Sequence, residues 1–395
     1  MRKGDKIDGL NGRMKELRVA LFTGNYGHIP DGVSLTLNRW VRFLLDQEIP
    51  VLIFAPTVET PQVSYVGEVV SVPSIPLWIR PEYRLTIGFP ARVQARLRAF
   101  KPTVAHIATP DWLGLRSMRF GQAHHIPLVA SYHTQFASYF HYYKLGLLET
   151  LAWKYHRWFY RQMKHLYVPS PSTAEALARR GVVDNIRIWP RGVEVDLFMP
   201  LKRDLAWRRS QGIADESPVI AFVSRLVLEK GLQTVMDTFR KLSARLPEAT
   251  VLIVGDGPER PRLQRSLPGA RFCGCLRGDE LARAYASSDV FFFPSTTETF
   301  GNVTLEAMSS GLPAVVADAA GSRDLVEHGV NGFILPPRRS AEFADHLCLL
   351  ATHPEIRQRM GHASRQKAFH YSWPNVHAGL LANYYDAIAD PSMGG

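Results

Sequence analysis

Short apolar runs recur along the chain, and longer segments with apolar residues at every third or fourth position lie between them. A short apolar run with polar or glycine-rich flanks is typical of a strand buried on both faces, and the longer period is typical of an amphipathic helix. The expected strands are Arg18–Thr23, Val51–Phe54, Val69–Val70, Val104–Ile107, Pro127–Ser131, Ile186–Pro190, Val219–Val223, Val251–Val254, Asp289–Pro294, Ala314–Ala317 and Gly332–Pro336. The expected helices are Ser34–Leu45, Pro90–Phe100, Gly114–Ala123, Asp279–Ser287, Asn302–Ser309, Ser340–Ala351, Pro354–Phe369 and Tyr371–Ile388. This alternation predicts an α/β protein with doubly wound parallel sheets.

Two carboxylates stand at fixed places in the strand–loop–helix unit that begins at Asp289. Glu298 lies in the loop after the apolar run, and Glu306 lies in the first turns of the following helix. Loops at the carboxyl ends of parallel strands, together with the free N–H groups of helix N-termini, bind anionic ligands. The sequence therefore indicates a ligand site here, although a capped helix beside a loop acid would fit the same residues.

The second half of the chain also places two cations after a strand. Arg225 and Lys230 follow the run Val219–Val223 and precede a helix that opens at Gly231. An arginine offers two hydrogen bonds to one phosphate and a lysine offers a point charge, so the pair is suited to a diphosphate. Gly255 and Gly257, after the next strand, either let the backbone approach a nucleotide or only make a turn.

The motifs together resemble the retaining nucleotide-sugar glycosyltransferases of family 4. The resemblance rests on Glu298-x7-Glu306 with Phe300-Gly301 between them, and on Glu306-Ala-Met-Ser-Ser-Gly-Leu-Pro313. Arg225 with Glu229-Lys230-Gly231 and Ser131-Tyr-His-Thr134 add to it. The pattern looks closest to glycolipid-forming and α-mannosyl-transferring members. One departure is Arg191 in the connector Arg191–Pro200, where the family commonly has Asn.

The resemblance implies two Rossmann-like domains that face each other across a cleft, the GT-B fold. The expected first domain is residues 1–193 with a helix in 372–395 that crosses back to it. The expected second domain, residues 194–371, would hold the nucleotide sugar. The chain length of 395 residues agrees with two domains of ~100–200 residues each.

The resemblance also assigns roles to single residues. It implies His133, Glu298, Arg225 and Lys230 as the catalytic group, with His133 facing the donor sugar. The implied donor-binding residues are Glu306, Phe300, Gly301, Asn302, Gly255, Gly257 and Gly32. On the acceptor side it implies His106, Asp111 and Tyr139. No Asp-x-Asp occurs in the chain, so we expect no metal and no cofactor, with the cations in place of a metal.

The charge of the chain is unevenly distributed. Residues 1–190 carry 24 Lys and Arg against 13 Asp and Glu, and the remainder carries 23 against 23. Two segments of the first half, residues 75–98 and 139–161, combine aromatic and basic residues. A helix with Arg92 and Arg96 on one face and apolar neighbours is suited to an anionic lipid surface. An inert basic surface is the alternative, and nucleic acid is disfavoured because no recognition motif accompanies the charge.

The hydropathy pattern bears on localisation. No apolar run reaches ~18 residues, so no transmembrane helix is expected. The polar, basic N-terminus does not resemble a signal peptide. Three cysteines fit a reducing compartment, and Cys273-Gly-Cys275 has no partner pair at metal-ligand spacing. We therefore expect a cytoplasmic protein, peripheral on the inner face of the cytoplasmic membrane.

The resemblance thus implies a retaining hexosyltransferase that uses GDP-mannose or a UDP-sugar, and with the basic first half of the chain it favours a lipid or lipid-linked acceptor. The alternatives are a soluble, polysaccharide or lipopolysaccharide acceptor, or a non-catalytic scaffold that binds a sugar nucleotide. An epimerase or a phosphorylase-like enzyme of the same architecture is a nearer rival, but the lysine context that a phosphorylase cofactor needs is not present.

Overall fold

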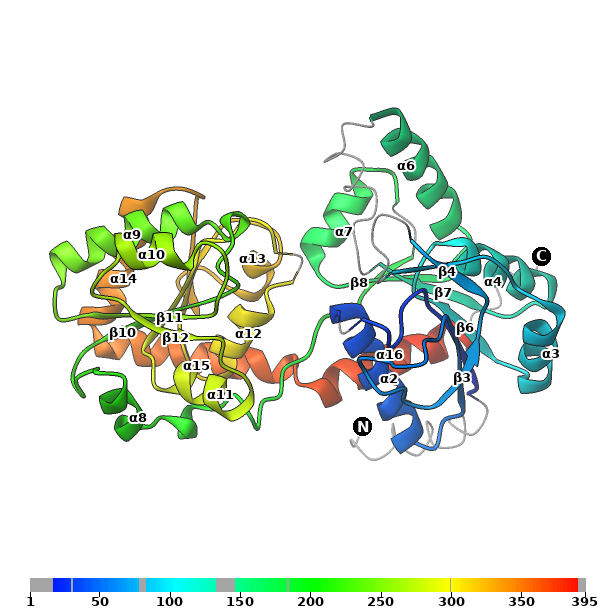
Figure 1. Cartoon of the computed structure of the whole chain (residues 1–395), viewed down its shortest axis with the longest axis horizontal. Helices are drawn as coiled ribbons and strands as arrows, with labels where there is room; N and C mark the ends of the chain where they lie inside the picture. Colours follow the sequence, from blue (N-terminus) through cyan, green and yellow to red (C-terminus); the bar gives the residue numbers. More distant parts are fainter. Residues whose placement is uncertain are drawn as a thin grey trace. The chain divides into compact units, whose positions relative to one another are not determined.

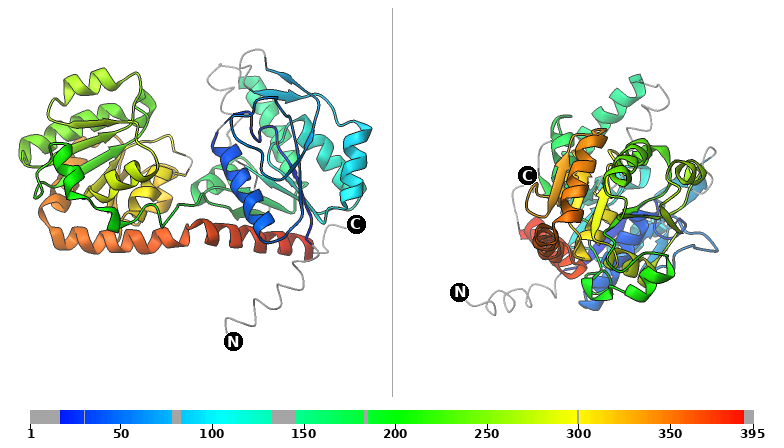
Figure 2. Two further views of the ribbon diagram at one scale, coloured as in Figure 1. Left: turned by 60° about the horizontal axis from the view of Figure 1, so that its bottom comes forward. Right: turned by 90° about the vertical axis from the view of Figure 1, so that its left-hand side faces the viewer.

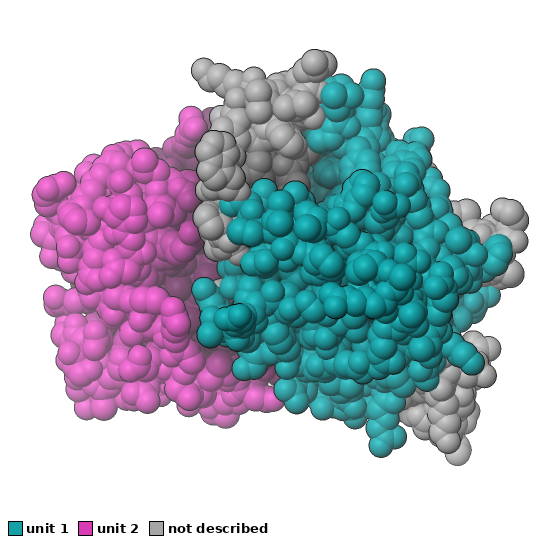
Figure 3. Space-filling model, turned by 45° about the vertical axis from the view of Figure 1, so that its right-hand side comes forward, with its two compact units in different colours: residues 1–169, 174–189, 377–395 teal, residues 170–173, 190–376 magenta. Residues whose placement is uncertain are grey.

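The computed structural model describes residues 17–29, 31–77, 83–132, 146–182, 185–298 and 300–389. The chain forms two compact units (Figure 3). The first unit comprises residues 1–169, 174–189 and 377–395, and the second comprises residues 170–173 and 190–376. The predicted domain boundaries at residues 193 and 371 stay predictions.

The first unit is built on a parallel seven-stranded sheet in the order β3-β2-β1-β6-β7-β8-β9 (Figure 1). Its strands are β1 Val19–Phe22, β2 Val51–Ala55, β3 Glu68–Ser71, β6 Val104–Ile107, β7 Leu128–Ser131, β8 His165–Val168 and β9 Ile186–Ile188. The central strands are buried along their whole length, which explains their continuous apolar runs. A separate antiparallel pair, β4 Ser74–Pro76 and β5 Arg84–Thr86, lies outside this sheet.

Helices cover both faces of the first sheet. They are α2 Gly32–Asp46, α3 Ala91–Phe100, α4 Trp112–Ala123, α6 Gly146–Tyr160, α7 Pro171–Ala178 and α16 Trp373–Ala389. α2 and the part of α16 that belongs to this unit lie together on one face (Figure 2), where the Trp40 indole N–H donates to the Tyr384 hydroxyl at 3.0 Å. The last helix therefore returns to the first unit from residue 377 onward.

The second unit is built on a parallel six-stranded sheet in the order β12-β11-β10-β13-β14-β15. Its strands are β10 Val219–Val223, β11 Thr250–Val254, β12 Arg271–Gly274, β13 Val290–Phe293, β14 Ala314–Ala317 and β15 Gly332–Leu335. β10 pairs with β11 on one side and with β13 on the other. The chain therefore adds strands outward from β10 in one direction and then, from β13 onward, in the opposite direction. Such a switch point is where open α/β sheets place their ligands.

The helices of the second unit also lie on both faces. They are α8 Leu205–Ser210, α9 Leu232–Arg245, α10 Arg260–Ser266, α11 Gly278–Ala286, α12 Asn302–Ser309, α13 Ser322–Leu325, α14 Ser340–Thr352 and α15 Pro354–His370. Two short 3₁₀ turns, η1 Pro200–Lys202 and η2 Leu228–Lys230, complete the unit. α9, α10 and α14 cover one face and α11, α12 and α15 the other (Figure 1).

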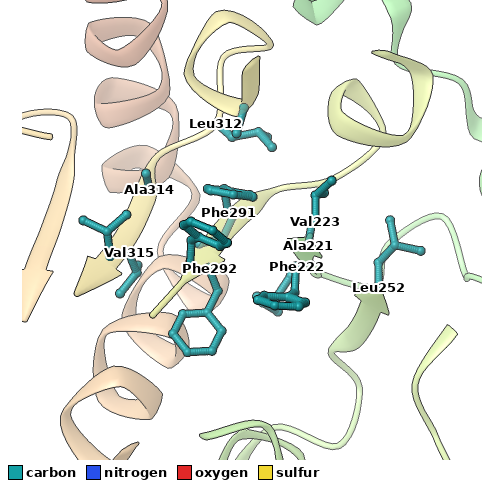
Figure 4. Packing of buried hydrophobic residues seen from close by; sticks show 14 of the residues in the cluster. Ala221, Phe222, Val223, Leu252, Phe291, Phe292, Leu312, Ala314 and Val315 are labelled. Carbon is teal, nitrogen blue, oxygen red and sulfur yellow. The ribbon is translucent and has the colours of Figure 1, made fainter. Parts of the chain in front are cut away.

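Alternation along β13 shows how the second core is filled (Figure 4). Phe291 packs against Tyr285 of α11, and Phe292 packs against Phe239 of α9 and Phe343 of α14. Both phenylalanines are fully buried. Each such side chain stabilises the fold by about 1.5–3 kcal/mol.

The prediction of two doubly wound parallel-sheet units is confirmed. None of the helices in the described parts of the chain combines the length and hydropathy that a bilayer crossing requires.

Candidate active site

In the second unit, the loops after β10 and β13 lie against each other. Gly231 caps the N-terminus of α9 with φ +73°, a left-handed conformation that glycine adopts without strain. A methyl group on Gly231 would come within 2.8 Å of the Pro294 carbonyl oxygen at the end of β13. A glycine is therefore required here for the two loops to meet.

Lys230 and Glu298 form the contact between these loops. The Lys230 ammonium donates to Glu298 Oε1 at 2.5 Å, and the Ser295 hydroxyl donates to the same oxygen at 3.2 Å. The side chains of the ion pair are only 14% and 16% exposed. Although 68 residues separate them, β10 and β13 are neighbours and bring them together.

Arg225 stands in the same loop as Lys230 but is exposed. Among the described residues, none forms an ion pair or hydrogen bond with its guanidinium group. A planar group with five N–H donors is thus available to an anion at the edge where Lys230 lies.

Gly255 and Gly257 allow the loop after β11 to lie against the loop after β10. A methyl group at Gly255 would overlap the Ser224 carbonyl oxygen at 1.8 Å, and one at Gly257 would approach the Leu226 carbonyl oxygen to 2.5 Å. The Leu226 N–H donates to the Asp256 carbonyl at 2.9 Å across the same contact. Both glycines are therefore explained by loop packing.

The N-terminus of α12 is shaped by two glycines with positive φ. Gly301 caps the helix at φ +92° with no side-chain hydrogen bond to the first turn. Gly321 has φ +84° and lies close to the Phe300 backbone. A methyl group added to Gly321 would come within 2.8 Å of the Phe300 backbone nitrogen. The Phe300 side chain itself is buried and packs on Tyr371. Among the described residues of this helix start, the backbone of Phe300 and Gly301 and the exposed Asn302 can face a ligand, and the helix dipole favours an anion there.

Glu306 lies one turn further along α12 and is half-buried. Burial raises the pKa of its carboxyl group to about 7, and the hydrogen bond from Tyr285 opposes this rise. The Tyr285 hydroxyl donates to Glu306 Oε2 at 3.1 Å. One carboxylate oxygen is thus occupied by the protein, and Tyr285 keeps the group in a fixed orientation.

In the first unit, Gly32 is the first residue of α2 and is exposed. A methyl group there would meet no atom within 4 Å, and its φ is not positive. The described residues therefore impose no steric need for glycine at this position.

Asp111 caps α4 and accepts from the Gly114 N–H at 2.9 Å. The Thr109 hydroxyl donates to its other oxygen at 3.1 Å. Burial raises the pKa of the Asp111 carboxyl, and these hydrogen bonds oppose the rise. One oxygen of Asp111 caps α4 and the other accepts from Thr109, so the carboxylate has a structural role. The predicted role of Asp111 on the acceptor side stays a prediction.

His106 requires a correction, because the structure places it in the core of the first unit. It is 0% exposed, its Nδ1 lies 2.5 Å from the Tyr384 hydroxyl, and its Nε2 lies 3.0 Å from the Ser131 hydroxyl. Burial lowers its pKa to about 3, so the ring is neutral. With both nitrogens occupied, His106 joins α16 to the sheet and cannot contact an acceptor.

Two further predicted site residues, His133 and Tyr139, lie outside the described residues. The structure adds partners that the sequence patterns did not single out: Tyr285, Ser295 and Gly321. Ser295 directly follows the apolar run of β13, which is a position that could have signalled a site. Tyr285 had no such signal, since it reads as a core residue of α11.

The described residues contain no group of three His, Cys, Asp or Glu side chains arranged to hold a metal ion. Cys273, Cys275 and Cys348 are free thiols. The expectation that no metal or cofactor is needed stays an expectation.

Two family models match the chain. The model described as Glycosyltransferase Family 4 matches residues 30–197, and the model described as Glycosyl transferases group 1 matches residues 217–353. The two matches fall on the two parallel sheets.

Several curated proteins resemble the chain over most of its length. A GDP-mannose-dependent alpha-mannosyltransferase of Mycolicibacterium smegmatis is 34% identical over 382 residues, which cover 95% of this chain and 99% of that protein. The sulfoquinovosyl transferase SQD2 of Arabidopsis thaliana is 31% identical over 94% of this chain and 74% of its own length. An alpha-monoglucosyldiacylglycerol synthase of Streptococcus pneumoniae is 25% identical over 94% of this chain and 86% of its own length.

Solved structures share the fold at low identity. A sucrose-phosphate synthase of Thermosynechococcus elongatus superposes with a TM-score of 0.72 at 18% identity, covering 94% of this chain and 99% of the other. HepE of Anabaena in complex with UDP superposes with a TM-score of 0.71 at 19% identity, covering 94% of this chain and 100% of the other. The architecture is therefore the two-sheet GT-B fold.

Proposed function

This chain belongs to glycosyltransferase family 4, and we propose that it transfers a hexose from a nucleotide sugar to a lipid or lipid-linked acceptor with retention of the anomeric configuration. The donor is GDP-mannose or a UDP-sugar. The second unit holds the donor, and the first unit supplies residues of the acceptor side.

The observation that carries this proposal is the cation pair at the switch point of the second sheet. Lys230 is held by Glu298 at 2.5 Å, and the exposed Arg225 lies in the same loop. When a sugar–phosphate bond breaks, negative charge develops on the leaving diphosphate. Two cations and the N-terminus of α12 stabilise that charge, so a metal ion is not required.

The two glutamates serve different parts of the donor. Glu298 accepts hydrogen bonds from hydroxyl groups of the transferred sugar, beside the backbone amides of Phe300, Gly301 and Asn302. Glu306 accepts from the ribose diol through the oxygen that Tyr285 does not occupy. A carboxylate that accepts two hydroxyl donors favours the nucleotide over a free sugar phosphate.

We propose retention from the family resemblance and not from the spacing of carboxylates. None of the carboxylates that we assign is placed as a covalent nucleophile. We therefore favour departure and attack on the same face of the sugar, within an ion pair. His133 assists on the donor sugar, and the leaving diphosphate takes the acceptor's proton.

The acceptor side of the proposal rests on the relatives and on charge. One relative is named as an alpha-monoglucosyldiacylglycerol synthase, and this name supports a lipid acceptor. The first half of the chain carries all of the excess positive charge. A basic half-molecule is attracted to an anionic membrane surface, so the protein acts peripherally at the cytoplasmic face.

A panel of nucleotide sugars tests this function. One donor should stabilise the protein against heat and be slowly hydrolysed, and acceptors should then be screened with that donor. Glu306→Ala and Arg225→Ala should weaken both donor binding and turnover. Wild-type kinetics in both variants would refute the site assignment. Transfer to a soluble glycan, with none to a lipid, would replace the acceptor class while leaving the donor chemistry intact.

A further inference from the structure

The antiparallel pair β4–β5 is a small hairpin that belongs to the first unit but not to its parallel sheet. Ile75 lies directly opposite Leu85 in this pair. The ladder continues on both sides, because the Leu77 N–H donates to the Tyr83 carbonyl and the Ile87 N–H donates to the Pro73 carbonyl, each at 2.9 Å. The described part of the hairpin is therefore regular enough for its two faces to be assigned.

One face of the hairpin is apolar and uncovered. Side chains of a strand alternate between faces, so Ile75, Leu77, Leu85 and Ile87 share one face. We call these four residues the hairpin face. Each of them is between 41% and 54% exposed. A contiguous exposed aliphatic patch of this kind marks a surface that binds another molecule or a membrane.

The opposite face of the hairpin is fixed to the protein. Thr86 is 2% exposed, and its hydroxyl accepts from the Leu113 N–H of α4 at 3.2 Å. Arg84 donates from Nε to the Ser74 hydroxyl at 2.8 Å across the strands. The hairpin is thus anchored on α4, and the hairpin face points away from this anchor.

Aromatic and basic side chains lie next to the anchor. Trp112, the first residue of α4, is 43% exposed, and the Arg116 guanidinium carbon lies 4.8 Å from the centre of its ring. Arg119, one turn further, is also exposed. Residues 83–132 contain seven Lys and Arg but only one carboxylate, Asp111, which caps α4. The surface around the hairpin is therefore suited to an anionic partner.

The helix α3, by contrast, does not offer an apolar outer face. Its large apolar residues Val93, Leu97 and Phe100 are buried in the first unit. On its outer side, Arg96 forms an ion pair with Glu68 at 2.6 Å. The helix expected from the sequence to contact lipid can supply charge but little apolar surface. The hairpin is the element that supplies it.

We propose that the hairpin face enters the headgroup region of an anionic lipid bilayer, with Trp112 at the interface and Arg116 and Arg119 paired with lipid phosphates. An aliphatic face, an amphipathic aromatic side chain and adjacent arginines are the combination that binds such interfaces. The inference rests on the lipid acceptor of the proposed function and specifies how the protein reaches it. A bilayer covers the four aliphatic side chains and neutralises the arginines at once.

Vesicle flotation tests the proposal with the full chain. Wild-type protein should float with vesicles of 70% phosphatidylcholine and 30% phosphatidylglycerol at low salt, and much less with phosphatidylcholine alone. Ile75→Ser with Leu85→Ser should weaken binding about tenfold or more, because two apolar side chains no longer leave water. Arg116→Gln with Arg119→Gln should weaken it by a similar factor and flatten its salt dependence.

The matched control is Leu201→Ser with Leu205→Ser, two exposed leucines of the second unit. This pair should leave vesicle binding unchanged. Equal binding by the hairpin variant and wild-type protein would overturn the proposal, and so would a wild-type dimer in sedimentation that the hairpin variant abolishes.

Nucleotide binding separates this proposal from the proposed function. Binding of nucleoside diphosphate should be the same in the hairpin variant and in wild-type protein, because the hairpin lies in the first unit. A protein that binds nucleotide but not vesicles overturns the membrane proposal alone. A protein that floats normally but binds no nucleotide overturns the proposed function alone.

Discussion

The Lys230 ammonium lies 2.5 Å from Glu298 Oε1, so the two loops at the switch point of the second sheet are joined by an ion pair. The Ser295 hydroxyl donates to the same oxygen at 3.2 Å. A diphosphate that binds at this edge would compete with Glu298 for the lysine. The pair therefore holds both groups in place before the donor arrives and frees Lys230 when it does.

Glu298→Gln tests this competition. The amide keeps the shape of the side chain but removes the charge that holds Lys230, so nucleoside diphosphate without sugar should bind several-fold more tightly. Turnover of the complete donor should fall by about 100-fold, because the sugar hydroxyls lose a charged acceptor. Calorimetry with the diphosphate and initial rates with the donor measure the two effects. Parallel losses in both would contradict the competition.

The raised pKa of Glu306 makes stability depend on pH. Its pKa is about 7 in the folded protein against 4.5 for the ordinary group, so the folded state keeps a proton that the unfolded chain releases. The free energy of unfolding should therefore fall as pH rises from about 4.5 to 7, by at most about 3 kcal/mol. Glu306→Gln lacks this titration. The difference between the melting temperatures of wild-type protein and Glu306→Gln should therefore change between about pH 4.5 and 7. A difference in melting temperature that stays constant over this range would contradict the prediction.

The same titration should control donor binding. Ribose hydroxyls bind the carboxylate form of Glu306, so donor affinity should rise as pH increases through about 7. The Tyr285 hydroxyl lowers the pKa of this group, and Tyr285→Phe should therefore move the midpoint to higher pH. Affinity measured from about pH 5.5 to 9 checks the shift. A midpoint that Tyr285→Phe leaves in place would show that Glu306 is not the titrating group.

Gly32→Ala separates a substrate contact from a structural requirement. A methyl group at this position meets no protein atom within 4 Å, so thermal stability should be unchanged or slightly higher. If a substrate approaches α2 here, turnover should still fall about tenfold or more. Gly269→Ala is the control, since that glycine also faces open space, and it should affect neither quantity. Full activity in Gly32→Ala would remove Gly32 from the site.

The buried network of His106 should matter for folding and not for chemistry. Tyr384→Phe removes the hydroxyl that contacts both His106 Nδ1 and the Trp40 indole N–H. Two buried polar atoms then lack a partner, and each costs about 1–3 kcal/mol. Because burial lowers the pKa of His106 to about 3, the unfolded chain binds a proton that the folded one rejects, and stability should fall below about pH 6.5. Denaturation curves of both proteins measure these effects. A selective loss of turnover with unchanged stability would contradict a structural role.

Much of the fold could be predicted because each strand carries its own signal. Val219–Val223 and the run around Phe291 are apolar throughout, and both are buried strands. The loops that follow them could be identified as a candidate site from Arg225, Lys230 and Glu298 in order along the chain. That Lys230 contacts Glu298 depends on the pairing of β10 with β13, which local patterns do not encode.

Each error or omission has an identifiable physical cause. His106 lies within a strand, and the local sequence does not tell which face of the sheet its side chain occupies. Its burial depends on Tyr384, which is 278 residues away. Tyr285 becomes a site residue only because α11 packs beside α12. The hairpin was missed because its strands, Ser74–Pro76 and Arg84–Thr86, are short and the first of them ends in proline. Long-range packing, not local propensity, decided the cases of His106 and Tyr285.

The central claim is that the second unit binds the diphosphate of a nucleotide sugar through Lys230. Calorimetry with GDP and UDP on wild-type protein, Lys230→Ala and Lys241→Ala tests it most directly, since Lys241 is an exposed lysine on α9 outside the site. Wild-type protein and Lys241→Ala should bind one of the two nucleotides equally, and Lys230→Ala should bind it about 10–100-fold more weakly. Equal affinity in Lys230→Ala, or no binding of either nucleotide to wild-type protein, would contradict the account.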